Sequence, residues 1–106
     1  MDMDLVFGAL SDPTRRAVVI RLAAGPASVK ELAAPFDMGL PAFMKHLAIL
    51  EDSDLVVSTK QGRVRTCMLV PEQLTKTKTW MEAQIDLWEG RSERLAAFVE
   101  QQGTAS

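Results

Sequence analysis

The sequence predicts a single, mainly helical domain that carries one two-stranded antiparallel ribbon. A chain of 106 residues fits one domain, and its 47% hydrophobic and 25% charged residues are typical of a folded protein. Apolar residues recur at helical spacing in both halves of the chain. Between the N-terminal and C-terminal helical segments, residues 55–70 are rich in β-branched side chains and contain no acidic residue. We therefore expect four short helices, then the ribbon, then one long helix.

Two helices are expected at the N-terminus. The first ends near Ser11, and Asp12-Pro13 then starts the second, because aspartate suits an N-cap and proline the first helical turn. Gly25-Pro26 ends the second helix. Arg15 and Arg16 lie near its start, where a cation could hold a phosphate. We favour a structural role for this pair, such as ion pairs with Asp12 or with the acidic C-terminal third.

A third and a fourth helix precede the ribbon. Ser28 and Glu31 form a capping-box pattern that opens a short helix to about Ala34, and Pro35 stops it. After a turn at residues 36–39, Pro41 falls in the first turn of the fourth helix, which ends in the acidic residues 51–54. Apolar residues at spacings of four and three mark its buried face: Phe43, Leu47 and Leu50.

The ribbon and the long helix complete the domain. Residues 55–60 have the composition of a strand, Gln61-Gly62 is a tight turn, and residues 63–68 alternate with period two. Pro71 closes the ribbon and begins a helix to about Gln101, whose apolar residues approach a heptad pattern. We place the domain at residues 1–102 and a disordered tail at residues 103–106.

Charge and composition favour a nucleic-acid partner and exclude the common catalytic constellations. The net charge is only −2, but the ribbon is basic while the C-terminal third is acidic. One histidine and one cysteine, 21 positions apart, offer no catalytic triad, and no glycine-rich phosphate loop is present. We therefore expect no enzyme. Cys67 alone cannot form an intramolecular disulfide, and neither a signal sequence nor a membrane span is evident, so we expect a cytoplasmic setting.

Three stretches carry a family resemblance. Residues 7–16 read Phe-Gly-Ala-Leu-Ser-Asp-Pro-Thr-Arg-Arg, residues 41–47 read Pro-Ala-Phe-Met-Lys-His-Leu, and Leu47-x-x-Leu50-Glu51 precedes Asp54-Leu55-Val56. With these residues the chain resembles the ArsR/SmtB family of winged helix-turn-helix transcriptional repressors, from about Val6 to Phe98. The resemblance implies five helices and a wing, a homodimer that packs through its first and last helices, and binding to double-stranded DNA.

The expected DNA-binding site combines the fourth helix in the major groove with the wing on phosphates or in the minor groove. Serine is common in the family where this chain has Gly39 and Met44, so hydrogen bonding to bases is reduced. Met44 can still touch a thymine methyl group. Arg65 is expected at the base of the wing, facing the sheet. The predicted contacts are Lys30, Gly39, Leu40, Pro41, Ala42, Met44, Lys45, His46, Lys60, Gln61, Gly62, Arg63 and Arg65.

The metal sites known in the family are not expected here. Metal-responsive members carry Cys-x-Cys where this chain has Ala33 and Pro35, and no histidine follows residue 46 to act as a ligand on the last helix. The resemblance is therefore to the metal-independent group, without a cofactor. Cys67 is expected to be a structural thiol; a redox role would need a resolving cysteine or an electropositive pocket.

Self-association is expected because a thirty-residue helix is longer than this domain needs. The predicted interface residues are Leu5, Val6, Leu74, Trp80, Met81, Ile85, Trp88, Leu95 and Phe98. A two-fold dimer would read a palindromic operator and repress transcription by occluding a promoter. Two alternatives stay open. One is a protein-interaction module with weakened DNA readout, and the other is a ligand-gated repressor with a pocket lined by Trp80, Trp88 or Met81.

Overall fold

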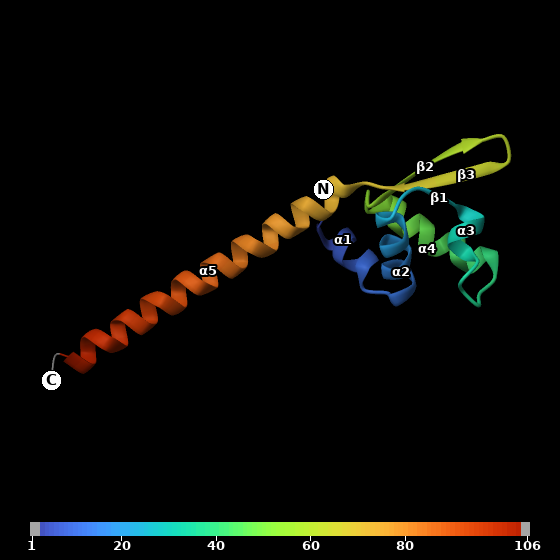
Figure 1. The fold of residues 1–106 in the computed structure, drawn as a ribbon. Coiled ribbons are helices and arrows are strands. Elements are labelled where there is room, and N and C mark those ends of the chain that lie inside the picture. Colours follow the sequence, from blue (N-terminus) through green and yellow to red (C-terminus); the bar gives the residue numbers. More distant parts are fainter. Residues whose placement is uncertain (1–2, 105–106) are drawn as a thin grey trace. The chain divides into compact units, whose positions relative to one another are not determined.

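The computed structural model describes residues 3–104 and contains five helices and three short strands (Figure 1). The chain divides after Thr75 into an N-terminal unit and a C-terminal helical unit. The order of elements is α1 (Met3–Leu10), α2 (Pro13–Ala23), β1 (Ala27–Ser28), α3 (Val29–Ala33), α4 (Leu40–Asp52), β2 (Val56–Gln61), β3 (Val64–Leu69) and α5 (Pro71–Thr104).

The local signals that predict the second and third helices are confirmed by their caps. The Asp12 side chain accepts a hydrogen bond from the backbone N–H of Arg15, and Pro13 opens α2. At α3 the capping box is complete, because Ser28 Oγ accepts from the Glu31 N–H while the Glu31 carboxylate accepts from the Ser28 N–H. These caps satisfy backbone donors that a helix start leaves without partners.

The sheet has three strands where the sequence predicts two. Strand β1 pairs antiparallel with β3, so that Ala27 lies opposite Cys67, and β3 also pairs with β2. A two-residue strand is too short to show an alternating pattern, which is why the sequence does not reveal β1. This third strand ties the wing to the segment between α2 and α3.

The turn of the wing lies one residue later than the sequence predicts. Gln61 pairs with Val64, which makes Gly62 and Arg63 the two central residues of the hairpin, not Gln61 and Gly62. Gly62 has φ +61°, a conformation that glycine adopts at little cost. The correction places Arg63 at the tip of the wing and not in a strand.

The core of the N-terminal unit lies between the helices and the sheet. Phe43, Leu47 and Leu50 are almost fully buried, as the spacing in α4 predicts. Val6 is 0% exposed and Leu74 packs against the same cluster, so both contribute to the core of this unit, and their place in a dimer surface stays a prediction. Burial of these side chains is the main source of stability.

The C-terminal unit consists of α5 from Lys76 onward. The helix includes Gly103 and Thr104, two residues of the expected tail, and residues 105 and 106 lie outside the described part, so disorder of the tail stays a prediction. Within residues 3–104, no helix combines the length and the apolar character needed to cross a membrane.

Candidate nucleic-acid interface

Helix α4 presents one apolar face to the core and a different face to solvent. Gly39 occupies its N-cap with φ −68° and ψ 154°, and it makes no side-chain capping bond. On the exposed side, Leu40 is 57% exposed and is followed by exposed Pro41, Ala42 and Lys45. Lys45 is exposed, and α4 contains no other lysine or arginine.

His46, the predicted neighbour of Lys45, is bonded within the protein. Its Nδ1 lies 2.9 Å from Arg15 Nη1 and 3.7 Å from Asp12 Oδ2. Because arginine has only donors, Nδ1 can accept this bond only in the tautomer that carries its proton on Nε2. A contact between His46 and DNA stays a prediction, and Nε2 is the nitrogen left to make it.

Arg15 and Arg16 have the structural role that the sequence favours, but their main partners are backbone carbonyls. Arg15 Nε donates to Ala9 O at 2.7 Å, and Arg16 Nη1 donates to Leu10 O at 2.9 Å. These carbonyls belong to the last turn of α1, which carries no basic residue of its own. Cations at a helix C-terminus offset its partial negative charge. The two arginines thereby join α2 to α1, and Arg15 extends the connection to α4.

Arg65 is likewise bonded to other residues of the protein. Its Nη2 donates to both carboxylate oxygens of Glu51, at 2.7 and 2.8 Å, and its Nε donates to Ser58 Oγ at 2.8 Å. The Ser58 hydroxyl in turn donates to Glu51 Oε1 at 2.6 Å. We call Glu51, Ser58 and Arg65 the wing clamp, because they join both strands of the wing to the end of α4. DNA contact by Arg65 stays a prediction and would compete with this clamp.

Lys60, Gln61, Gly62 and Arg63 form the exposed tip of the wing. Among the residues described, neither Lys60 nor Arg63 has an ion pair or a side-chain hydrogen bond. Their charges are therefore available to an anionic partner.

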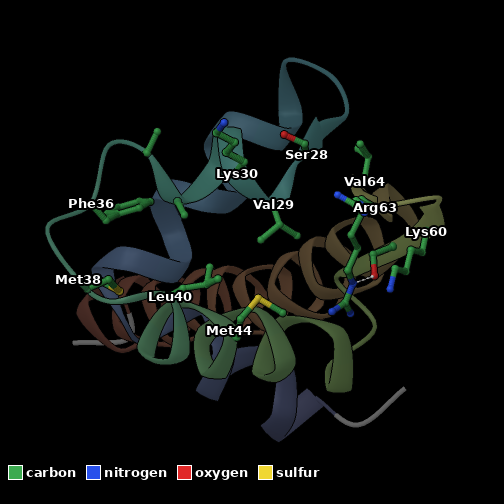
Figure 2. Close-up of a pocket in the computed structure, with 14 residues that line it drawn as sticks. Ser28, Val29, Lys30, Phe36, Met38, Leu40, Met44, Lys60, Arg63 and Val64 are labelled. Carbon is green, nitrogen blue, oxygen red and sulfur yellow. Dashed lines mark hydrogen bonds between the residues drawn. The ribbon is translucent and has the colours of Figure 1, made fainter.

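A groove of about 1170 Å³ lies between α3, α4 and the wing. Figure 2 shows Val29 from α3 and Leu40 and Met44 from α4 pointing into it, with Lys60 and Arg63 coming from the wing. Lys30 lies on the α3 side. None of the described residues that line the groove is acidic. The fold thus gathers four predicted cations around one concave surface: Lys30, Lys60, Arg63 and Arg65, of which Arg65 is paired with Glu51.

The sequence reasoning missed several residues that position this surface. Glu51 and Ser58 complete the wing clamp, and Asp12 with Arg15 holds His46. Val29, Phe36 and Met38 line the groove, although their sequence pattern reads only as a helix face and a turn. No local spacing connects residues 15 and 46 or 51 and 65, so only the folded chain reveals these pairs.

Cys67 lies in the core, and its environment does not activate the thiol. It is 0% exposed, and burial raises the pKa of its thiol above the ordinary value of 9.0, with the Glu51 carboxylate acting in the same direction.

No cluster of metal-binding side chains is present within residues 3–104. No group of three or more histidine, cysteine, aspartate or glutamate side chains comes together there.

Known proteins resemble the chain in both sequence and fold. Residues 10–59 match a family described as a helix-turn-helix domain. The chain is 41% identical over 76 residues to the HTH-type transcriptional regulator Rv2034 of Mycobacterium tuberculosis, covering 72% of this chain and 71% of that protein. It is 30% identical over 79 residues to the transcriptional repressor SdpR of Bacillus subtilis, covering 74% of this chain and 88% of SdpR.

A solved structure agrees with this relationship. The crystal structure of an ArsR family transcriptional regulator is 54% identical to the chain and superimposes with a TM-score of 0.81, covering 84% of this chain and 98% of that one. The five helices and the wing described above have the architecture expected of this group. The chain therefore belongs to the ArsR/SmtB family of winged helix-turn-helix DNA-binding transcriptional regulators, which are not enzymes.

Proposed function

We propose that this protein is a homodimeric repressor that binds a palindromic operator without a metal effector. The observation that carries the proposal is the acid-free groove beside α4, where Lys30, Lys60 and Arg63 accompany an exposed helix face. DNA phosphates are bound by such cations, and the recognition helix of a helix-turn-helix protein enters the major groove. SdpR, a relative described as a repressor, supports the direction of regulation.

Base recognition by α4 rests on apolar contact more than on hydrogen bonds. Around Lys45 the helix offers Leu40, Ala42 and Met44 instead of hydroxyl or amide side chains. In the major groove the apolar feature of a base pair is the C5-methyl group of thymine. We therefore expect operator positions under the start of α4 to be thymines.

The dimer is proposed from the apolar surface of the last helix. Met81, Ile85, Trp88 and Leu95 repeat at heptad-like spacing and are 42%, 52%, 66% and 63% exposed in the single chain. Apolar surface of this extent on one helix is characteristic of a subunit interface. Two copies joined there would present two α4 helices to two operator half-sites.

Metal independence is proposed from the chemistry of the positions that bind metals elsewhere in the family. Ala33 and Pro35 supply no ligand atoms in their side chains, and the thiol of Cys67 is buried. A regulator with this composition would respond to another signal or act by its abundance alone.

The test is fluorescence anisotropy with duplexes that tile the protein's own upstream region. Four cations in each of two protomers, Lys30, Lys45, Lys60 and Arg63, give an expected slope of about −7 for log K against log salt. The same titration with EDTA and with added Zn²⁺ tests metal independence, and sedimentation measures the dimer. Binding that is equal for every duplex, or a monomer at binding concentrations, would contradict the proposal.

One alternative function has a specific motivation in α4. Gly39 and Met44 lack the hydroxyl groups common in the family, which fits a winged dimer that binds a protein instead of an operator. The triple variant Lys45→Ala, His46→Ala and Arg63→Ala separates the two functions. A repressor loses DNA binding and remains a dimer, whereas an interaction module keeps its partner.

A further inference from the structure

The groove between α3, α4 and the wing is more apolar than a DNA-binding surface requires. Its lining includes Lys30, Lys60 and Arg63, which suit phosphates, and Arg65, which is paired with Glu51. The apolar part of the lining is larger: Val29, Ala33, Ala34, Phe36, Met38, Leu40, Met44 and Val64. A volume of about 1170 Å³ is slightly above the range of about 300–1000 Å³ that holds small organic ligands, so the groove has room for one.

DNA does not account for most of this apolar lining. A sugar–phosphate backbone is anionic and well hydrated, so it matches the cations but not a wall of aliphatic and aromatic side chains. Thymine methyl groups could meet Leu40 and Met44 at the start of α4. Phe36 and Met38, in the connection between α3 and α4, belong to the opposite side of the groove from the wing (Figure 2).

We propose that this groove binds an amphipathic organic anion, with an apolar body against Phe36, Met38 and Met44 and a carboxylate directed toward Lys60 or Arg63. The charge complementarity carries this choice, because the described lining residues include cations and no acidic residue. Methionine and phenylalanine side chains adapt well to aliphatic or aromatic ligands. The ligand's apolar area removed from water supplies the driving force.

Occupation of the groove would act as induction, a consequence that rests on the proposed repressor function. The carboxylate would neutralise wing cations that otherwise contact phosphates, and the apolar body would lie beside α4. Ligand and DNA would therefore compete for one surface. This location differs from the pocket between the last helices that the sequence suggests, with Trp80, Trp88 or Met81 as its lining.

The experiment is an amide NMR titration of the full chain, without DNA, using decanoate below its micelle-forming concentration. The matched probe is decan-1-ol, which has the same alkyl chain and no charge. We expect decanoate to shift the amides of the groove residues and to bind about fivefold more tightly than the alcohol, the effect of an exposed ion pair. Lys60→Ala should reduce that difference.

Two alanines that end neighbouring helices provide a matched pair of variants. Ala34 is the C-cap of α3 and lines the groove, whereas Ala24 is the C-cap of α2 and lies outside it; both are exposed and have αR backbones. Ala34→Phe should fill the groove and weaken decanoate binding at least about fivefold, because an aromatic ring removes space that the alkyl chain uses. Ala24→Phe should leave the affinity unchanged.

The outcomes separate the ligand site from the repressor function. Shifts confined to α5, equal affinities for decanoate and decan-1-ol, or equal effects of the two phenylalanine variants would each overturn the ligand site. Anisotropy with an operator duplex then tests whether decanoate competes with DNA. Decanoate should weaken the DNA binding of the parent chain and of Ala24→Phe more than that of Ala34→Phe. A chain that binds decanoate but no specific DNA would overturn the repressor function and leave the ligand site standing.

Discussion

The base and the tip of the wing carry arginines two residues apart, and the fold gives them different surroundings. Arg65 at the base donates to Glu51 and Ser58, while Arg63 at the tip is exposed and has no ion pair among the described residues. The same side chain therefore stabilises the wing in one place and remains available to DNA in the other. A count of charges along the hairpin overestimates its capacity to bind phosphates.

Removal of the arginine at the base should have the largest effect on stability. In Arg65→Ala, Glu51 loses a bidentate partner while its side chain is only 25% exposed, and Ser58 loses a donor. We expect the free energy of unfolding to fall by about 2 kcal/mol, as for hydrogen bonds to charged groups. Urea denaturation measures this change, and Lys76→Ala, an exposed site outside the N-terminal unit, serves as the control. An unchanged midpoint would show that the wing clamp contributes little.

Removal of the arginine at the tip should weaken DNA binding and not the fold. For Arg63→Ala we expect a change of at most about 0.5 kcal/mol in unfolding free energy, typical of a surface substitution. The salt slope of the dimer should become shallower by about 2, because each protomer loses one phosphate contact, and the affinity at 0.1 M salt should fall roughly tenfold. Anisotropy across a salt series provides both values. Destabilisation equal to that of Arg65→Ala would erase the distinction between tip and base.

Replacement of thymine by uracil sharpens the contrast between the wing and α4. Uracil lacks the methyl group but keeps every hydrogen-bonding atom, so contacts from Leu40 and Met44 should weaken while phosphate contacts remain. We expect a loss of about 0.8 kcal/mol, or about fourfold, for each contacted methyl group. The salt slope should not change. Equal affinity for the uracil and thymine duplexes would show that α4 does not read this feature.

Gly39→Ser should strengthen the start of α4. The backbone at this N-cap is extended, and a β-carbon added there would meet only the Pro41 ring, at an ordinary distance of 3.7 Å. A serine hydroxyl could accept from a free N–H of the first turn, which should stabilise the fold by a few tenths of a kcal/mol, roughly. Thermal unfolding measures this change, and Gly39→Ala, which lacks the acceptor, should show no gain.

The carboxylate of Asp12, which caps α2, should make the stability of the fold sensitive to acid. The backbone N–H of Arg15 holds the pKa of this carboxyl below its ordinary value of 3.8, and the charge of Arg15 acts in the same direction. Because the folded pKa lies below the unfolded one, the stabilisation is complete above the unfolded value and is lost as pH falls through the folded value. The decrease in melting temperature from pH 5 to pH 3 should therefore be smaller for Asp12→Asn than for the parent chain.

Local chemistry made most of the fold predictable from sequence. Asp12-Pro13, Ser28 with Glu31, and the spacing of Phe43, Leu47 and Leu50 mark helices because caps and apolar stripes act within a few residues. The sequence does not reveal strand β1, because a two-residue strand has no period. It places the turn at Gly62-Arg63 one residue too early, because hairpin register depends on cross-strand pairing.

The candidate DNA-binding surface was only partly predictable. Lys45, Lys60 and Arg63 are exposed cations, as their positions in a polar helix face and a basic ribbon indicate. The same patterns indicate Arg65 and His46 as DNA contacts, yet both side chains are bonded to other residues of the protein. Sequence patterns identify which residues carry a charge but not which opposite charge lies beside them after folding.

By itself the sequence determined the order of helices and wing, because caps, proline positions and apolar periodicity operate over one or two turns of chain. Only the tertiary structure decided which of its cations face outward. That choice depends on contacts such as Arg15 with His46 and Glu51 with Arg65, between side chains that the folded backbone brings within about 3 Å. Such pairs form because a half-buried charge is stable only beside a partner.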